Sequence, residues 1–207
     1  MITKNVLLVR HGSTTATQQQ RFSGLTNIPL CRDGRQQARS LAMVVRHFQP
    51  HACLCSPLDR CLQTAALIVP ADHPPVVTAP ELRETDFGAW EGLTYAEIAQ
   101  SDPHGMSRMM CLDPDFAPGN GELIGGFLAR VQCAARLITE HPARNILVVT
   151  HGGVFRSLLC YLLGLDTKKH FHTFDIGPAA VAEISTFDGG AVMRCLRPSP
   201  LGLEGDS

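Results

Sequence analysis

The chain of 207 residues lacks the features that would place it in several large classes of protein. No apolar run approaches the roughly 20 residues that a helix needs to cross a bilayer, so a membrane partner is not expected. Lys and Arg form no block, and the formal net charge is −1, which argues against a nucleic-acid partner. Charged residues make up only 18% and hydrophobic residues 44%, values typical of a folded globular protein. The expected partner is therefore a small molecule.

Signals for export, metal binding and a second domain are also missing. Met1–Asn5 runs directly into an apolar segment, without the successive charged, apolar and small-residue regions of a signal peptide. The eight cysteines, several of them inside apolar patterns, are therefore expected to be free thiols of a cytoplasmic protein. Cys53 and Cys55 have no second pair of ligands elsewhere, so neither a metal nor another cofactor is expected. Without repeat or linker, the chain predicts one domain over residues 1–200 and a frayed tail over 201–207.

Two histidines occupy the same position relative to an apolar run, and this is the most informative feature that the chain does have. Arg10–Gly12 follows the run Val6–Val9, and His151–Gly152 follows the run Ile146–Val149. Short runs rich in Val and Ile that stop at a Gly are typical of buried parallel strands followed by tight turns. Because ligands bind beyond the carboxyl ends of strands in open α/β sheets, both imidazoles could face one crevice. Ordinary loop histidines are the alternative, and the repeated context favours a site.

Alternating helical and extended patterns predict an α/β protein. Extended segments are expected at residues 6–9, 51–55, 76–78, 146–150, 181–186 and 191–196, and helices at 33–49, 57–69, 122–140 and 154–163, with a short helix from Thr94. Asp33 and Ser56 are predicted helix caps, and Leu123 is expected on the buried face of its helix. Residues 102–121 hold three Pro and three Gly and are expected to form a long loop. The alternation predicts a three-layer α/β/α sandwich with a mostly parallel central sheet.

Five side chains are expected to gather at the strand ends: Arg10, His11, Arg60, Glu84 and His151. Two arginines and two histidines would form a cationic pocket in a chain of nearly neutral charge. Arginine binds phosphate through planar, bidentate hydrogen bonds, and no Gly-rich nucleotide loop is present, so side chains are expected to hold a phosphate. Surface salt bridges are the alternative role for the arginines. Glu81, Asp86 and Glu91 compete with Glu84 as the acid, and His170 and His172 are expected in a solvated turn.

Four ordered motifs resemble those of the histidine phosphatase superfamily, also called the phosphoglycerate mutase-like family. They are Leu8–Thr14, Ser56–Ala65, Glu81–Gly92 and Thr150–Gly153. Gly24–Leu30 is similar to the substrate loop of the same family. The resemblance extends through nearly the whole chain, and it implies the family's fold and phosphoryl-transfer chemistry.

The resemblance implies a role for each of the five side chains. His11 would be the nucleophile, attacking as a neutral imidazole to form a phosphohistidine that water then hydrolyses. Arg10, Arg60 and His151 would stabilise the phosphoryl oxygens during transfer. Glu84 would protonate the leaving alkoxide and then accept a proton from water. No metal is implied, since the arginines supply the positive charge.

Four further residues are implied to contact the substrate: Thr17, Ser23, Gly24 and Gly152. Thr17 stands where the family usually carries Asn, and Ser13 stands where it often carries Glu. A threonine hydroxyl can still donate one hydrogen bond to phosphate, so substrate binding is expected to survive the change. The segment Gly119–Glu122 only loosely resembles the family's Gly-Gly-Glu-Ser element.

The length of the chain favours a phosphatase, because the mutases of the family tend to be longer. Residues 21–24, 145–151 and 168–176 are similar to segments of a phosphatase branch that acts in cobalamin assembly. A small phosphomonoester of that route is therefore the expected substrate. A broad-specificity phosphatase, a phosphoglycerate mutase and a non-catalytic phosphate-binding module are the alternatives, and the five intact side chains disfavour the last. The sequence leaves the physiological ester and the oligomeric state open, a homodimer included.

Overall fold

A six-stranded sheet forms the centre of the computed structural model, which describes residues 2–70 and 72–198. The strands are β1 (Ile2–Arg10), β2 (Ala52–Cys55), β3 (Val76–Thr78), β4 (Asn145–Thr150), β5 (Val181–Phe187) and β6 (Gly190–Arg197). Their order is β3-β2-β4-β1-β5-β6. The first four strands run parallel, whereas β5 is antiparallel to both β1 and β6. The expected mostly parallel sheet is confirmed.

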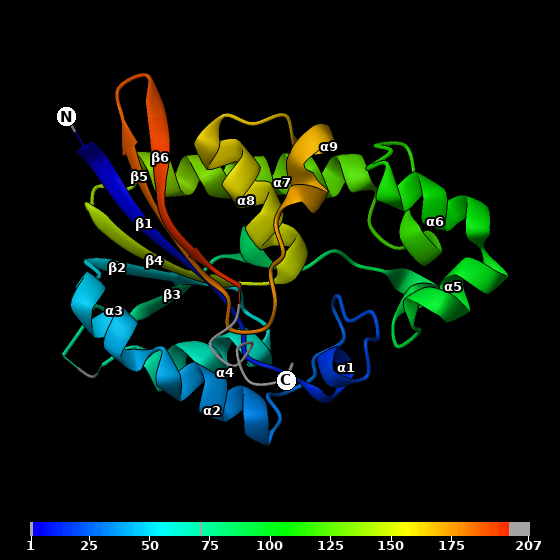
Figure 1. Cartoon of the computed structure of the whole chain (residues 1–207), viewed down its shortest axis with the longest axis horizontal. Helices are drawn as coiled ribbons and strands as arrows, with labels where there is room; N and C mark the ends of the chain where they lie inside the picture. Colours follow the sequence, from blue (N-terminus) through cyan, green and yellow to red (C-terminus); the bar gives the residue numbers. More distant parts are fainter. Residues whose placement is uncertain (1, 71, 199–207) are drawn as a thin grey trace, which may run out of the picture.

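Helices cover both faces of this sheet, which confirms the three-layer α/β/α sandwich (Figure 1). One face carries α2 (Arg32–Ser40), α3 (Ala42–Phe48) and α4 (Asp59–Ile68), and the other carries α7 (Ile124–Glu140) and α8 (Gly152–Leu163). The shorter helices are α1 (Thr15–Gln18), α5 (Tyr95–Ser101), α6 (Pro103–Met110) and α9 (Thr167–His170), with 3₁₀ turns η1 (Pro80–Leu82), η2 (Gly88–Trp90), η3 (Pro118–Asn120) and η4 (Phe171–Thr173). Among the described helices, none is long and apolar enough to span a membrane.

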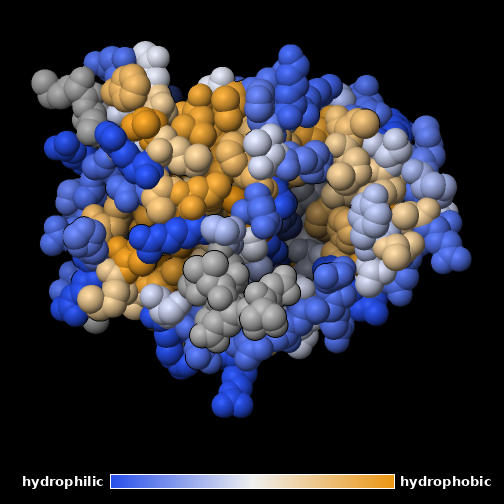
Figure 2. All heavy atoms as spheres, in the orientation of Figure 1, coloured by the Kyte–Doolittle hydropathy of each residue, from blue (hydrophilic) through white to orange (hydrophobic). Residues whose placement is uncertain are grey.

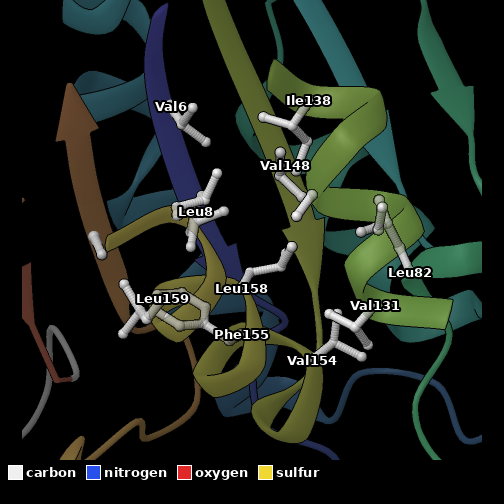
Figure 3. Close-up of a cluster of buried hydrophobic side chains, with 14 of the residues drawn as sticks. Val6, Leu8, Leu82, Val131, Ile138, Val148, Val154, Phe155, Leu158 and Leu159 are labelled. Carbon is white, nitrogen blue, oxygen red and sulfur yellow. The ribbon is translucent and has the colours of Figure 1, made fainter. Parts of the chain in front are cut away.

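The unbroken apolar run of β1 is explained by burial on both of its faces. Successive side chains of a strand point to opposite sides, so Val6 and Leu8 pack toward α7 and α8 (Figure 3). Leu7 and Val9 pack toward α2, α3 and α4 on the other side. All four side chains are at most 1% exposed. Burial of each contributes about 1.5–3 kcal/mol to the free energy of unfolding. This burial holds β1 in place, and with it the position of the residues that follow the strand.

A third, smaller hydrophobic cluster lies apart from the sheet. It is formed by Phe87, Trp90, Ile98 and Met106, which come from the segment Glu81–Gly92 and from α5 and α6. In Figure 1 these two helices project beyond the carboxyl ends of the parallel strands. The part of the chain that carries η2, α5 and α6 therefore adds a lobe with its own core.

The helix predicted over residues 33–49 is two helices. Cys31 rather than Asp33 precedes the first helical residue, and its Sγ accepts a hydrogen bond from the Gly34 amide at 3.4 Å. Asp33 lies in the first turn, where a carboxylate interacts favourably with the helix N-terminus. The chain changes direction at Leu41, next to Ser40, whose hydroxyl donates to the carbonyl of residue 37 at 2.7 Å. Such a bond competes with the helical ladder and favours a bend.

Two predictions based on proline are wrong. Ser56 does not cap α4, because its Oγ lies 2.7 Å from His151 Nε2 and the helix begins three residues later. Residues 102–121 are not one loop, because α6 begins at Pro103. The Asp102 carboxylate accepts a hydrogen bond from the Gly105 amide at 2.8 Å and caps that helix. Pro103 occupies the first helical position, where its missing N–H costs nothing.

The remaining predicted elements differ from the structure mainly at their ends. Leu123 precedes α7 and is 52% exposed, so its predicted place on the buried face is wrong. The helix predicted from residue 154 begins at Gly152, immediately after His151. All eight cysteines are free thiols in this structure. The tail predicted over 201–207 lies outside the described residues, and the single domain over 1–200 stays a prediction.

Candidate active site

The two histidines lie at the ends of neighbouring strands. Residue 10 of β1 pairs with Thr150 of β4, so His11 and His151 leave the sheet side by side. Their ring centroids are 5.2 Å apart, with 64° between the ring planes. The chain leaves β1 toward the face covered by α2 and leaves β4 into α8 on the opposite face. A crevice opens where such neighbouring strands feed opposite faces, and this is the usual ligand site of an open α/β sheet.

A pocket of about 320 Å³ opens above His11. Its polar lining includes Arg10, His11, Ser23, Glu84, Gly152, Gly153 and Arg156. Its apolar lining includes Phe22, Phe87, Met109, Met110, Leu112, Ile124, Phe127 and Phe171. In Figure 2 the surface is hollowed between the lobe that carries α5 and α6 and the rest of the molecule. The pocket therefore has a charged end on the sheet and an apolar wall supplied largely by the lobe.

His11 is held as a neutral imidazole. Its Nδ1 lies 2.8 Å from the Gly12 carbonyl oxygen, so Nδ1 carries the proton and donates it. The other ring nitrogen, Nε2, is then unprotonated and has a free lone pair. Burial lowers the pKa of His11 well below its ordinary value, and the charges of Arg10 and Arg60 lower it further. The side chain is 4% exposed. This is the form in which an imidazole can attack phosphorus.

His151 lies beneath His11 with both ring nitrogens bonded to protein. Arg60 Nε donates to its Nδ1 at 3.1 Å, so Nε2 must carry the proton, which it donates to Ser56 Oγ at 2.7 Å. Burial lowers the pKa of His151 well below its ordinary value, and the charge of Arg60 adds to that effect. Neutral His151 therefore stands between Arg60 and Ser56 in a fixed orientation.

Arg60 is buried and donates hydrogen bonds to backbone carbonyl groups of residues 23–26, at the start of the segment that resembles the substrate loop. Its two terminal nitrogens donate to the oxygens of Ser23 at 3.3 Å, Gly24 at 2.6 Å and Thr26 at 3.0 Å. Burial lowers the pKa of Arg60, and the neighbouring Cys61, Glu84 and Glu91 partly oppose that effect. A guanidinium group stays charged in proteins at neutral pH. The same side chain thus ties His151 to the loop that borders the pocket.

Glu91 binds the same segment through the backbone amides of residues 24–26. The Glu91 carboxylate accepts hydrogen bonds from the amides of Gly24 at 2.8 Å and Leu25 at 3.0 Å, with Thr26 at 3.4 Å. A glycine is required at position 24, because a Cβ there would lie 1.8 Å from the carbonyl oxygen of Thr85. The segment is therefore fixed between a buried cation and a carboxylate.

Two hydrogen-bonding atoms at the pocket have no partner within the described residues, and both belong to predicted site residues. These are Arg10 Nε and Ser23 Oγ. Arg10 also donates through a terminal nitrogen to the Ile176 carbonyl oxygen, and burial lowers its pKa to about 10, so it is a cation at neutral pH. A buried polar group without a partner costs about 1–3 kcal/mol. A ligand that brings oxygen acceptors would offset that cost.

Glu84 is held at the start of α8. Its carboxylate accepts hydrogen bonds from the Gly153 amide at 3.0 Å and from its neighbour Thr85 at 3.1 Å. A Cβ at position 153 would lie 2.7 Å from Glu84 Oε1, so glycine permits the close approach. Of the four acids considered in this loop, all within the described part of the chain, only Glu84 lines the pocket. Asp86 instead accepts from the amide of residue 88 at 2.9 Å.

The family is shown by a sequence comparison: the model of the histidine phosphatase superfamily (branch 1) matches residues 6–197. The chain belongs to this superfamily. The adenosylcobalamin/α-ribazole phosphatase of Escherichia coli K12 is 34% identical over 199 residues, which cover 95% of this chain and 97% of that protein. The α-ribazole phosphatase structure from Shigella flexneri superimposes with a TM-score of 0.81 at 32% identity, covering 93% and 95%. A mycobacterial glucosyl-3-phosphoglycerate phosphatase with bound VO3 gives 0.81 at 28%, covering 95% and 99%.

The four residues expected to contact substrate in this histidine phosphatase do not all reach the pocket. Ser23 and Gly152 line it, and Gly24 lies behind Ser23 in the segment held by Arg60. The Thr17 hydroxyl instead donates to the Thr14 carbonyl oxygen at 2.9 Å and accepts from the Thr14 amide at 2.8 Å. Thr17 therefore closes the N-terminus of α1 and has no hydroxyl proton free for phosphate in this arrangement.

The roles of three residues at the histidine phosphatase site were not predicted from the sequence. Ser56 orients His151, Glu91 fixes the substrate loop, and Arg156 lines the pocket. Only Arg156 has a sequence signal. It follows Gly152 by four positions, a spacing that places both residues on one face of a helix beginning at Gly152.

Replacing Glu91 with Gln is expected to weaken the substrate loop. With its oxygen in the place of Oε1, the Gln amide can still accept from Gly24 and Leu25, but its NH₂ group cannot accept from the Thr26 amide as Oε2 does, and the loop must then be ordered by the substrate. Loss of one such bond costs about 1–1.5 kcal/mol, so KM should rise about tenfold. Steady-state kinetics measures this, with Glu140→Gln, a change of an exposed residue at the end of α7, as the matched control. An unchanged KM would contradict the assigned role.

The two buried histidines should make stability fall in mild acid. Because their pKa values are lowered in the native state, the unfolded chain binds their protons first as pH drops below about 6.5. The free energy of unfolding should then fall with decreasing pH by up to about 1.4 kcal/mol per pH unit for each histidine. Urea unfolding between pH 7.5 and 5.5 measures the slope. His11→Ala should reduce it by one histidine's share, and equal slopes for both proteins would contradict the prediction.

Proposed function

We propose that this histidine phosphatase hydrolyses phosphomonoesters through a phosphohistidine formed on His11. The observation that carries the proposal is the neutral His11 ring with its unprotonated Nε2, in a pocket that is also lined by Arg10 and Ser23, whose Nε and Oγ have no partner among the described residues. In the first step Nε2 forms a bond to phosphorus and the bond from phosphorus to the ester oxygen breaks. In the second step water attacks phosphorus and the N–P bond breaks, which releases inorganic phosphate. Two moderate barriers replace one high barrier.

The cationic side chains stabilise the oxygens of the transferred group. Arg10 and Ser23 supply donors directly, and the N-terminus of α8 at Gly152 adds amide N–H groups of favourable polarity. Arg60 and His151 act from beneath. The charge of Arg60 attracts the phosphoryl oxygens, and His151, which accepts from Arg60 Nε and donates to Ser56 Oγ, holds that guanidinium in place. Each donor is fixed before the substrate arrives, so little reorganisation is needed during transfer.

Glu84 handles the proton in both steps. As a carboxylic acid it transfers a proton to the leaving alkoxide, and the alcohol departs. The resulting carboxylate then accepts a proton from the water that attacks the phosphohistidine, which restores the acid. The hydrogen bond from Gly153 keeps the carboxyl group at the mouth of the pocket throughout.

The proposed substrate is α-ribazole 5′-phosphate. The Escherichia coli and Shigella flexneri relatives carry the α-ribazole phosphatase name, and their similarity extends over at least 93% of this chain. The pocket supports the same choice, because its apolar wall suits an alcohol that carries a flat aromatic ring. The glucosyl-3-phosphoglycerate phosphatase among the structural relatives suggests an acidic ester as the second candidate. A small acid would leave the apolar wall without a partner.

The test is a panel of esters assayed in excess EDTA: α-ribazole 5′-phosphate, 3-phosphoglycerate and p-nitrophenyl phosphate. The expected result is turnover that survives chelation and a kcat/KM for α-ribazole 5′-phosphate about a hundredfold above the others, which corresponds to about 2.7 kcal/mol. Equal kcat/KM values would indicate a broad-specificity phosphatase. Phosphate binding without turnover of any ester would indicate the non-catalytic module.

A further inference from the structure

We infer that Arg156 selects the leaving alcohol by binding its hydroxyl groups. Arg156 lies one turn of α8 beyond Gly153, the residue whose amide binds the proposed acid Glu84. This inference rests on the proposed function and extends it from the phosphate end to the other end of the pocket. Arg156 lines the pocket from α8, and much of the apolar lining comes from the lobe. The group that we expect Arg156 to bind is the ribose of the substrate.

The Arg156 guanidinium is held in place with two donor groups to spare. Its Nε donates to the Phe174 carbonyl oxygen at 3.0 Å, and its central carbon lies 5.8 Å from the centroid of the Phe171 ring. Neither terminal nitrogen forms a hydrogen bond with the described residues. A side chain whose Nε is hydrogen-bonded and whose guanidinium lies over an aromatic ring loses little further conformational freedom when a ligand binds. The two free NH₂ groups are therefore preorganised donors.

The position of Arg156 on α8 sets which substrate atoms it can meet. Gly153, whose amide holds Glu84, lies three residues before it, so the two residues share a helix face and are about 5–6 Å apart. Glu84 is placed to protonate the ester oxygen of the substrate. The free nitrogens of Arg156 therefore reach atoms a few bonds beyond that oxygen. In a ribose 5′-phosphate these are the ring oxygen and the secondary hydroxyls.

Charge balance favours neutral oxygens over a second anion. Burial lowers the pKa of Arg156 below its ordinary value, and the nearby carboxylates of Glu84 and Asp175 partly oppose that effect. The guanidinium is thus already accompanied by acidic groups in a site that also receives a phosphate. A hydroxyl or ether oxygen can accept its hydrogen bonds without adding a further negative charge. A carboxylate is the competing partner, and the experiment separates the two.

The test compares two esters that differ only in hydroxyls: α-ribazole 5′-phosphate and its 2′,3′-dideoxy form. Wild-type enzyme should prefer the hydroxylated ester by about thirtyfold in kcat/KM, and Arg156→Met should reduce that preference to about threefold or less. Arg156→Lys should recover only part of it, because an ammonium group lacks the planar pair of donors. Arg136→Met, the same change on the exposed side of α7, should keep the full preference.

Other outcomes overturn the inference in distinguishable ways. An equal fall for both esters in Arg156→Met would assign Arg156 only to holding Phe171 and Phe174. A selective loss of 3-phosphoglycerate turnover would assign it a carboxylate instead. Wild-type turnover of p-nitrophenyl phosphate but of neither ribosyl ester would overturn both this inference and the α-ribazole assignment, while the phosphohistidine chemistry would stand. Wild-type turnover of the ribosyl esters without discrimination would overturn this inference alone.

Discussion

Replacing His11 with alanine is expected to lower kcat/KM for every phosphomonoester by at least about 10⁴-fold. The change removes the only atom proposed to bond with phosphorus, and His172, the other histidine among the described lining residues, has its Nε2 3.0 Å from the Met110 carbonyl oxygen. Arg10 and Ser23 would still bind the phosphate group, so the loss should fall on kcat far more than on KM. Single-turnover kinetics separates the two parameters.

A trapping experiment gives the His11 prediction a chemical readout. Brief reaction with an ester labelled in its phosphoryl group, followed by alkaline quenching, should leave an acid-labile label on the wild-type peptide that contains residue 11. The label should be absent from His11→Ala and present in His51→Ala, which changes an exposed histidine. Turnover within tenfold of wild type in His11→Ala would refute the proposed intermediate.

Glu84→Gln is the second change with a large expected effect, and its size should depend on the leaving group. Glutamine keeps the shape of the side chain and an oxygen for the Gly153 amide, but it has no proton to give. For esters of ordinary alcohols, kcat/KM should fall about 10²–10⁴-fold. p-Nitrophenolate leaves without a proton, so its departure should remain fast.

The Glu84 variant should therefore show a burst with p-nitrophenyl phosphate. One equivalent of p-nitrophenolate should appear rapidly, followed by slow turnover, because the second step still lacks a base for the attacking water. Glu81→Gln is the matched control, since Glu81 belongs to the same loop but does not line the pocket. A loss of equal size for alkyl and aryl esters, without a burst, would show that Glu84 does not transfer the proton.

The parts of the fold that follow from local pattern were predictable. The runs that form β1 and β4 are apolar on both faces, and only a strand covered on both sides needs that composition. A polar residue followed by proline was a less reliable signal, because such a dipeptide marks the cap of one helix and not of another. Asp102 caps α6 ahead of Pro103, whereas Ser56 ahead of Pro57 does not cap α4. The difference is a partner distant in sequence, since the Ser56 hydroxyl is engaged by His151.

The same reason explains which site residues escaped prediction. His11 and His151 stand immediately after strands, so local sequence reveals their place. Glu91 acts on the amides of residues 24–26, which are more than 60 positions away, and no periodicity in either segment encodes that contact. The Thr17 hydroxyl could have served a ligand or the backbone, and the choice depends on the geometry of α1. Contacts across long sequence separations required the folded chain.

The separate core of the lobe divides the enzyme into two parts with different freedom to change. The charged end of the pocket is anchored to the ends of β1 and β4, so a substitution there disturbs the sheet. Phe87, Trp90, Ile98 and Met106 instead support the apolar wall without sharing the central core. Exchange of the 94–123 segment between superfamily members, which replaces Ile98 and Met106 and keeps Phe87 and Trp90, is therefore a route to new substrate preferences that leaves the phosphoryl-transfer apparatus in place. Laboratory evolution of this enzyme is best directed at that segment.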